Sequence, residues 1–365
     1  MKRRILIIVL CLLLQAALPA CGTERSAPEP SPAAQETSDA PAATDPRAEE
    51  KHQKQVFAMD TVMILTAYGP QGEAALDAAE ELIYTLEADL DPESATGSVY
   101  ALNAGAGTSV PVSGDCYNVM STALRYWKLS GGALDPGMYP LSKAWGFVGG
   151  DYRVPPQEEI RALLAAKDTP DLLLDESASA ALVPAGMEVS FGAVAKGYTA
   201  QAVCDLLAGM GVKSAILSLG GNVQTLGDRK PDGSPWQVAV TDPRDTGAYV
   251  GVLTTGQAAV VTSGGYQRFF ERDGVTYIHI LDPVTGYPVD NDLTSVTVVT
   301  DDGAKADALS TALFVMGKDG ALDFYAAQGD FEMVLITTDD TVIVTPGIAA
   351  SFAETSDDYT YEYIG

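Results

Sequence analysis

An aspartate lies within an otherwise apolar segment near the end of the chain. Residues 304–315 read AKADALSTALFV, and their alanine and leucine spacing predicts a helix that is largely buried. A carboxylate in such surroundings costs free energy unless another group pairs with it, so Asp307 needs a partner. Thr311 follows one helical turn later and shares a helix face with Asp307.

This pair allows two interpretations. A carboxylate and a hydroxyl oxygen are ligands that a hard cation such as Mg²⁺ prefers, with water or substrate phosphates supplying the rest. In the structural alternative, Asp307 accepts hydrogen bonds from backbone amides or a lysine, and the Thr311 hydroxyl bonds a carbonyl of its own helix. The segment alone favours neither interpretation.

Histidine is scarce, which restricts the metal chemistry of the protein. Of the 2 histidines, His52 falls in a predicted N-terminal tether, so His279 is the only one expected in the folded region. A zinc or iron site with two or three histidines is therefore excluded. His279 alternates within a predicted strand, residues 276–281, just before a turn sequence at 282–286. A histidine on a strand is, taken alone, more often structural than catalytic.

Glycine-bearing turns offer backbone amides to a ligand. Residues 192–198, GAVAKGY, lead into a predicted helix at about 195–209, so free amides and the Lys196 ammonium meet there and suit an anion. The turns at 219–222 and 262–266 follow predicted strands. Glycine in such turns lets a ligand approach closely, but as often it simply makes the turn.

The composition excludes some classes of protein. The 365 residues include 49 Asp and Glu against 22 Lys and Arg, a net charge of −27. Nucleic-acid binding needs lysines and arginines that displace counterions, so DNA and RNA are excluded as main partners. A phosphate site would have to use helix N-termini, backbone amides or a metal ion. With 47% apolar and 19% charged residues, the chain is predicted to be globular.

The first residues predict a targeting sequence. Residues 1–4 are cationic, and 5–14 form an apolar run too short for a stable bilayer anchor. The LPAC that follows ends at Cys21, in the pattern at which bacterial lipoproteins are cleaved and lipidated. We therefore expect a lipoprotein signal peptide at 1–21 and, through lipid on Cys21, anchoring at the extracytoplasmic side of the cell membrane. The alternative is an ordinary signal peptide, which would release the protein.

The rest of the chain divides into a tether and one domain. Residues 22–51 have the composition of a flexible acidic tether, and 52–365 are expected to fold. Cys11 leaves with the leader and Cys21 carries lipid, so only Cys116 and Cys204 remain, too few for a disulfide scaffold. Cys204 lies in an apolar helical pattern and is predicted to be a packed thiol. Whether it pairs with Cys116 stays open.

The periodicity of the domain predicts a mixed α+β fold in which antiparallel pairing dominates the second half. Helices are expected at 73–86, 117–129, 156–165 and 195–209. Strands are expected at 56–67, 214–219, 236–240, 251–253, 258–262, 276–281, 293–300, 331–337 and 341–344.

Seven short segments stand in a specific order along the chain. They are FAMDT at 57–61, LDP at 134–136 with PL at 140–141 and WGF at 145–147, FGAVAKGY at 191–198, LGGN at 219–222, TSGGY at 262–266, HILDPVTGYP at 279–288 and ADALSTA at 306–312. Together they resemble the ApbE family of FAD:protein FMN transferases over about residues 55–345. The resemblance implies an ApbE-like fold of mixed, largely antiparallel sheets with packed helices.

The resemblance also implies an activity and a set of site residues. A member of this family binds FAD with Mg²⁺, cleaves the pyrophosphate, attaches FMN to a Thr or Ser hydroxyl of a partner protein and releases AMP. By position, the metal ligands would be Asp307, Thr311 and the main-chain carbonyl of Ala193, and His279 would assist proton transfer. The residues that would contact FAD are Met59, Ala133, Leu134, Asp135, Ser190, Lys196 and Leu281.

Some positions depart from the family pattern. Gly137 stands where a threonine is usual, Ser190 replaces a common aspartate, and Leu90 occupies a position that is often aromatic. Asp60 and Gln201 also differ from the residues usual there, which are glycine and aspartate. These departures bear on the affinity for FAD, whereas the Asp307 and Thr311 pair and the segment around His279 are intact.

Two other functions fit the same residues. One is an FAD pyrophosphatase, in which water replaces the protein hydroxyl and FAD becomes FMN and AMP. The other is a flavin-binding lipoprotein without catalysis. For the transferase, the topology and the family together suggest an acceptor outside the membrane, such as a flavin-carrying extracytoplasmic electron-transfer subunit.

Overall fold

The computed structural model describes residues 49–364. The predicted signal peptide (1–21), Cys21 and most of the predicted tether lie outside the described residues. In the described part, no helix has both the length and the apolar character needed to cross a membrane.

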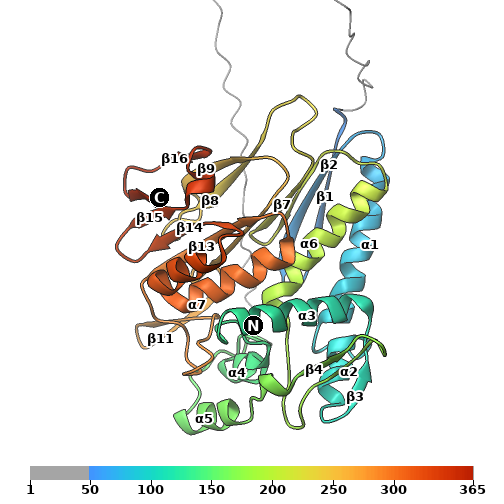
Figure 1. Cartoon of the computed structure of the whole chain (residues 1–365), viewed down its shortest axis with the longest axis vertical. Helices are drawn as coiled ribbons and strands as arrows, with labels where there is room; N and C mark the ends of the chain where they lie inside the picture. Colours follow the sequence, from blue (N-terminus) through green and yellow to red (C-terminus); the bar gives the residue numbers. More distant parts are fainter. Residues whose placement is uncertain (1–48, 365) are drawn as a thin grey trace, which may run out of the picture. The chain divides into compact units, whose positions relative to one another are not determined.

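A large sheet forms the centre of the domain (Figure 1). Its nine strands lie in the order β1-β2-β6-β7-β10-β13-β14-β15-β17. Neighbours pair antiparallel, apart from the parallel pair of β15 and β17. The strands are β1 (Lys51–Ala58), β2 (Thr61–Tyr68), β6 (Ala215–Leu219), β7 (Asn222–Leu226), β10 (Ala259–Gly264), β13 (Leu293–Thr300), β14 (Glu332–Thr337), β15 (Thr341–Val344) and β17 (Thr360–Tyr363).

Smaller sheets complete the strand inventory of the described residues. They have the orders β16-β9-β8, β3-β5-β4 and β11-β12. Their strands are β3 (Ser109–Pro111), β4 (Leu173–Asp175), β5 (Ala180–Leu182), β8 (Trp236–Thr241), β9 (Tyr249–Thr255), β11 (Phe269–Arg272), β12 (Val275–Ile278) and β16 (Phe352–Glu354).

Helices α6 and α7 pack against each other on one side of the large sheet, with α1 beside α6 (Figure 1). Their buried side chains and those of the sheet form two large apolar clusters, one centred on α7 and the other between α1, α6 and β2. The α-helices are α1 (Gly72–Leu90), α2 (Ser98–Ala104), α3 (Gly114–Leu129), α4 (Tyr139–Trp145), α5 (Gln157–Ala165), α6 (Gly192–Gly209), α7 (Gly303–Gln328) and α8 (Pro346–Ala349).

The backbones of α6 and α7 touch at a pair of glycines. A Cβ atom on Gly197 would lie 2.1 Å from the Gly303 carbonyl oxygen, and one on Gly303 would lie 2.4 Å from the Gly197 carbonyl oxygen. Real Cβ atoms do not come so close to backbone oxygen, so both positions require glycine. The crossing therefore brings the second turn of α6 against the first turn of α7.

The α+β prediction is confirmed, and so are the expected helices and the antiparallel second half. Several boundaries were wrong. The strand expected at 56–67 is a hairpin, because Met59 and Asp60 adopt positive φ angles of 49° and 58° and reverse the chain. Helix α6 already begins at Gly192, and β12 ends at Ile278, so His279 follows the strand instead of lying within it.

His52 does not lie in the tether as expected. It belongs to β1, where it pairs with Ala67 of β2, and its ring lies against Gly72 at the start of α1. Alternating exposure along β1 leaves Lys51, Gln53 and Gln55 exposed, while Lys54 is half-buried on the face of His52 and Val56, so this polar sequence still forms a strand. Because both histidines lie in the described residues, their number still excludes a site with three histidines but no longer excludes one with two.

The two cysteines of the domain are buried and unpaired. Cys204 lies on α6 and Cys116 on α3, in different apolar clusters. Burial raises the pKa of each thiol to about 12, which keeps both protonated at neutral pH. The prediction that Cys204 is a packed thiol is confirmed, and the open question of a pairing with Cys116 is answered.

Replacing Gly197 with alanine tests the helix crossing. The added methyl group would meet the Gly303 carbonyl oxygen and the Asp307 Cβ atom, which is 2.7 Å from its position, so the helices must separate. We expect Gly197→Ala to lower the free energy of unfolding by about 2 kcal/mol in urea denaturation. Gly209→Ala, at the other end of α6 with no neighbour within 4 Å, is the control and should be neutral or slightly stabilising. Equal stability of both variants would contradict the crossing.

Candidate active site

The carboxylate of Asp307 is buried at the crossing of α6 and α7. Asp307 is only 3% exposed, and its Oδ2 atom accepts a hydrogen bond of 2.8 Å from the Gly197 amide. The partner that the sequence required is therefore, in part, a backbone amide. This contact satisfies one oxygen, and Oδ1 accepts no side-chain hydrogen bond from the described residues.

The same hydrogen bond affects a carbonyl in the first turn of α6. In a regular helix the Gly197 amide would donate to the carbonyl of Ala193, four residues earlier. Because Asp307 competes for that proton, the Ala193 oxygen keeps acceptor capacity for another group. The first turn of α6 thus offers a carbonyl oxygen close to the carboxylate.

Thr311 lies in a cluster of hydroxyl groups one turn along α7. The Ser263 hydroxyl, at the end of β10, lies 2.9 Å from the Ser310 hydroxyl and 3.3 Å from the Thr311 hydroxyl. Ser310 in turn donates to the carbonyl of Asp307, at 2.9 Å. This network ties α7 to the sheet and fixes the helix face that carries Asp307 and Thr311.

The donor atoms at this point suit a hard cation. They comprise a carboxylate of Asp307, a hydroxyl of Thr311 and a carbonyl of Ala193, all oxygen ligands. Among residues 49–364, no three His, Cys, Asp or Glu side chains gather in a way that could hold a metal ion. A cation here would therefore take its remaining ligands from water or from a bound phosphate.

His279 is held in one tautomer. Its Nδ1 atom lies 3.1 Å from the carbonyl oxygen of Arg268, and that oxygen also accepts the His279 amide at 3.0 Å. A carbonyl can only accept, so Nδ1 carries the proton in the neutral ring and Nε2 keeps a free lone pair. Burial, followed by the nearby charges of Lys196 and Arg268, lowers the pKa of His279 to about 4. The ring is thus a neutral proton acceptor at physiological pH.

The predicted FAD contact Met59 lies in the turn between β1 and β2, beside α6. Its amide donates to Oε1 of Glu87 at 2.5 Å, and its sulfur lies 3.9 Å from the hydroxyl of Thr199 on α6. The side chain of Asp60, next in the turn, pairs with Arg268 at 2.9 Å. These contacts hold the turn against both α6 and the segment that supports His279.

Ser190 and Asp135 come together just before α6. The Ser190 amide donates to the Pro136 carbonyl at 3.0 Å, and its hydroxyl lies 3.4 Å from the Gly192 amide. The carboxylate of Asp135 accepts from the Gly137 amide at 2.9 Å and from the Thr169 hydroxyl at 2.6 Å. Both of its oxygens are engaged, the second by a lysine, so a ligand would meet the backbone of this residue.

The other predicted contacts lie around the same turns. Ala133 and Leu134 pack on the cluster that contains the start of α6, and Leu281 packs with Met138. Lys196 is close enough to His279 to depress its pKa. The departure at Leu90 places a buried side chain in the core at the end of α1. The structure thus places Asp307 against α6 and Leu134 in the cluster that contains the start of α6. Leu281 lies in a separate apolar cluster.

Sequence reasoning missed some residues of this site. Ser263 lies in the TSGGY segment that drew attention for its glycines, and its hydroxyl could have been considered with them. Arg268 acts through its carbonyl, which no side-chain pattern can reveal. Lys167, which pairs with Asp135, lies in an ordinary helix-to-loop sequence without a signal.

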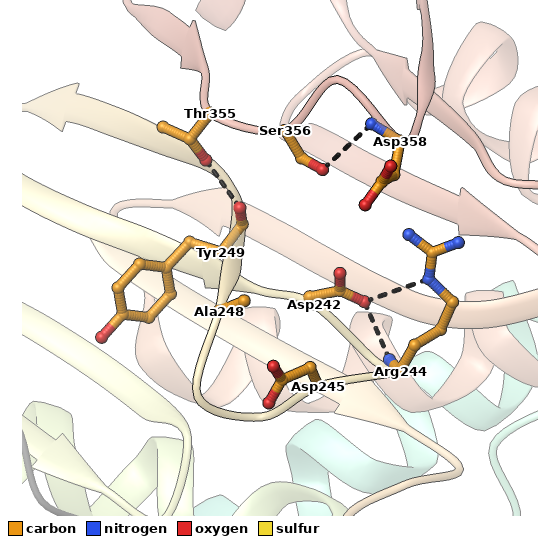
Figure 2. Close-up of a pocket in the computed structure, with 8 residues that line it drawn as sticks. All are labelled: Asp242, Arg244, Asp245, Ala248, Tyr249, Thr355, Ser356 and Asp358. Carbon is orange, nitrogen blue, oxygen red and sulfur yellow. Dashed lines mark hydrogen bonds and ion pairs between the residues drawn. The ribbon is translucent and has the colours of Figure 1, made fainter.

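Two surface cavities lie elsewhere in the domain. One, of about 460 Å³, is lined by the β8–β9 turn and the segment before β17, and Figure 2 shows its mixture of acidic side chains with Arg244. The other, of about 540 Å³, lies along α1 and the start of α3. Neither is lined by a predicted site residue.

Comparison with known proteins identifies the family of this chain. The profile of the ApbE family matches residues 59–335. An FAD:protein FMN transferase of Klebsiella pneumoniae is 35% identical over 292 residues, 79% of this chain and 89% of that protein. Another of Treponema pallidum is 33% identical over 307 residues, 79% and 85% of the two chains.

Solved structures also resemble this domain. The ApbE protein of Thermotoga maritima superposes with a TM-score of 0.77 at 28% identity, covering 84% of this chain and 100% of that one. The flavinyl transferase ApbE of Pseudomonas stutzeri, in its apo form, gives a TM-score of 0.71 at 29% identity, covering 80% and 93%. The chain described here belongs to the ApbE family.

Proposed function

We propose that this protein is an FAD:protein FMN transferase, which transfers FMN from FAD to a Thr or Ser hydroxyl of an acceptor flavoprotein and releases AMP. The observation that carries the proposal is the buried Asp307 carboxylate at the contact between α6 and α7, with Thr311 on the same helix face. The curated relatives with this activity support it over most of the chain.

Mg²⁺ is the cation that we propose for the oxygen ligands Asp307, Thr311 and Ala193. When bound, it would neutralise charge on the pyrophosphate and act as a Lewis acid. The Ala193 amide in the first turn of α6 and the Lys196 ammonium are suited to bind phosphate oxygens, whereas the Val194 amide already donates to the Phe191 carbonyl at 2.8 Å. Phosphoryl transfer depends mainly on positioning and charge neutralisation, which these groups provide.

His279 would move the proton of the reaction. The acceptor hydroxyl oxygen forms a new bond to the phosphorus of the FMN part, the bond from that phosphorus to the bridging oxygen breaks, and AMP leaves with that oxygen. The hydroxyl proton passes to Nε2 of His279, whose lone pair is free in the Nδ1–H tautomer. In the pyrophosphatase alternative, water takes the place of the hydroxyl, and in the binding alternative no bond is broken.

We also propose that the protein acts at the extracytoplasmic face of the cell membrane, anchored by lipid on Cys21. The support is the sequence pattern of residues 1–21 and the acidic tether composition that follows. An acceptor exposed on that side, such as an electron-transfer subunit, would be within reach of such a tethered enzyme.

The role of Asp307 is tested by replacing it with alanine. Without the carboxylate the cation loses its charged ligand, so we expect AMP release from FAD and Mg²⁺ to fall by at least about a thousandfold. Mass spectrometry of a candidate acceptor should show the FMN adduct with the unchanged protein and none with the variant. Asp323→Ala, an exposed aspartate in the part of α7 that follows a kink at Gly317, is the control and should keep its activity. AMP release without adduct on any acceptor would favour the pyrophosphatase.

The pH dependence tests His279. Because its pKa lies at about 4, the ring loses its free lone pair only as the pH falls through that value. We expect kcat/KM at pH 5.5 to stay within about twofold of its value at pH 7.5, whereas a base with the ordinary pKa would lose about tenfold. His279→Gln should reduce kcat by roughly a hundredfold or more. His52→Gln is the control. If the loss of kcat/KM at low pH shifted in His52→Gln, the assignment of His279 as the proton acceptor would be refuted.

Lipid anchoring is tested at Cys21. The protein purified from its membrane should carry the mass of a lipid on Cys21 and enter the detergent phase of a phase separation. Cys21→Ser should abolish both properties, because the hydroxyl is not a substrate for the thioether linkage. A Cys21→Ser protein that still enters the detergent phase would show that another segment anchors it.

A further inference from the structure

We propose that Lys167 is a positioning residue that sets the spacing between two sides of the flavin site. One side is the segment 133–138, which contains the predicted FAD contact Asp135. The other is the segment 279–288, which begins at His279. This inference rests on the proposed function and adds a residue to its site that neither the sequence nor the family resemblance indicated.

The ammonium group of Lys167 connects the two segments directly. It lies 2.8 Å from Oδ2 of Asp135 and donates to the Pro283 carbonyl oxygen, also at 2.8 Å. The Asp135 side chain is 4% exposed and that of Lys167 16%, so the pair is largely shielded from water and screened little by salt. The contact therefore acts as a fixed link, unlike a surface ion pair.

The segment at the Pro283 end is rigid enough to transmit this link. Asp282 accepts the Val284 amide at 2.7 Å, and the indole N–H of Trp145 donates to the Gly286 carbonyl at 2.9 Å. Leu281, just before this turn, forms an isolated bridge with Pro288. Displacing Pro283 would therefore shift the whole 279–288 segment, including the residues predicted to line the site.

Gly137 makes room for the lysine. A Cβ atom at this position would lie 2.9 Å from Cγ of Lys167, 3.0 Å from the Thr169 hydroxyl and 2.5 Å from the methyl group of Met187. A side chain here would displace the stem of Lys167 from its route to Asp135. The resemblance implies a threonine at position 137. In this chain, glycine at that position leaves the space that the Lys167 side chain needs to reach Asp135.

The test compares two variants that differ only in the lysine. Lys167→Met alone would leave the buried Asp135 charge unpaired, which can unfold a protein for an unrelated reason. Asp135→Asn removes that charge, and the double variant Asp135→Asn/Lys167→Met then removes the link to Pro283. We expect the Kd for FAD, measured by flavin fluorescence with Mg²⁺ present, to be about tenfold higher in the double variant than in Asp135→Asn.

The kinetic readout separates positioning from stability and from catalysis. At saturating FAD, kcat of the double variant should stay within about twofold of Asp135→Asn, while KM rises with Kd. Lys143→Met, which removes an exposed lysine on α4 paired with Glu188, should change neither. An unchanged Kd, or a lower kcat at unchanged Kd, would overturn the proposal.

A second variant covers the case in which the double variant does not fold. Gly137→Ala removes no charge but displaces Lys167, so it should raise the Kd for FAD in the same direction, and an unchanged Kd would refute the link. The proposed function fails separately. If the unchanged protein binds FAD but forms no adduct on any acceptor, the transferase is wrong, while the difference in Kd still tests Lys167.

Discussion

A single hydrogen bond, from the Gly197 amide to the Asp307 carboxylate, fixes the relation between α6 and α7. It forms only because Gly197 and Gly303 let the two backbones touch, and it stabilises a carboxylate that would otherwise be costly in the apolar core. The same contact leaves acceptor capacity on the Ala193 carbonyl. The packing of α6 on α7 and the position of the Asp307 carboxylate therefore depend on the same contact. The hydroxyl cluster around Ser263 ties this part of α7 to the sheet.

The acidic character of this chain opposes the binding of an anionic substrate. A protein with a net charge of −27 repels a pyrophosphate at long range, so local groups must supply the positive potential. The Ala193 amide at the start of α6, the ammonium of Lys196 and a cation at Asp307 would do so without a basic surface. Burial, and after it the charges of Lys196 and Arg268, lowers the pKa of His279 and so keeps the ring neutral.

Much of the fold could be predicted from local patterns, because the long helices and the strands of the second half carry clear periodicity. The short strands β3, β4 and β5 and the hairpin turn at Met59 could not, since they depend on pairing with distant segments and on positive φ angles at ordinary residues. At the site, the Asp307 and Thr311 pair was visible as a polar pair on an apolar helix. Contacts made through main-chain atoms, such as the Arg268 carbonyl, and long-range pairs, such as Lys167 with Asp135, were not.

The most direct test of the account is to locate the cation. Crystals of the protein grown with FAD and Mn²⁺ in place of Mg²⁺ would show the metal by its anomalous scattering. We predict one strong peak in contact with Asp307 Oδ1, the Thr311 hydroxyl, the Ala193 carbonyl and a phosphate oxygen of FAD. A peak bound elsewhere, with the Asp307 carboxylate facing away from the pyrophosphate, would contradict it.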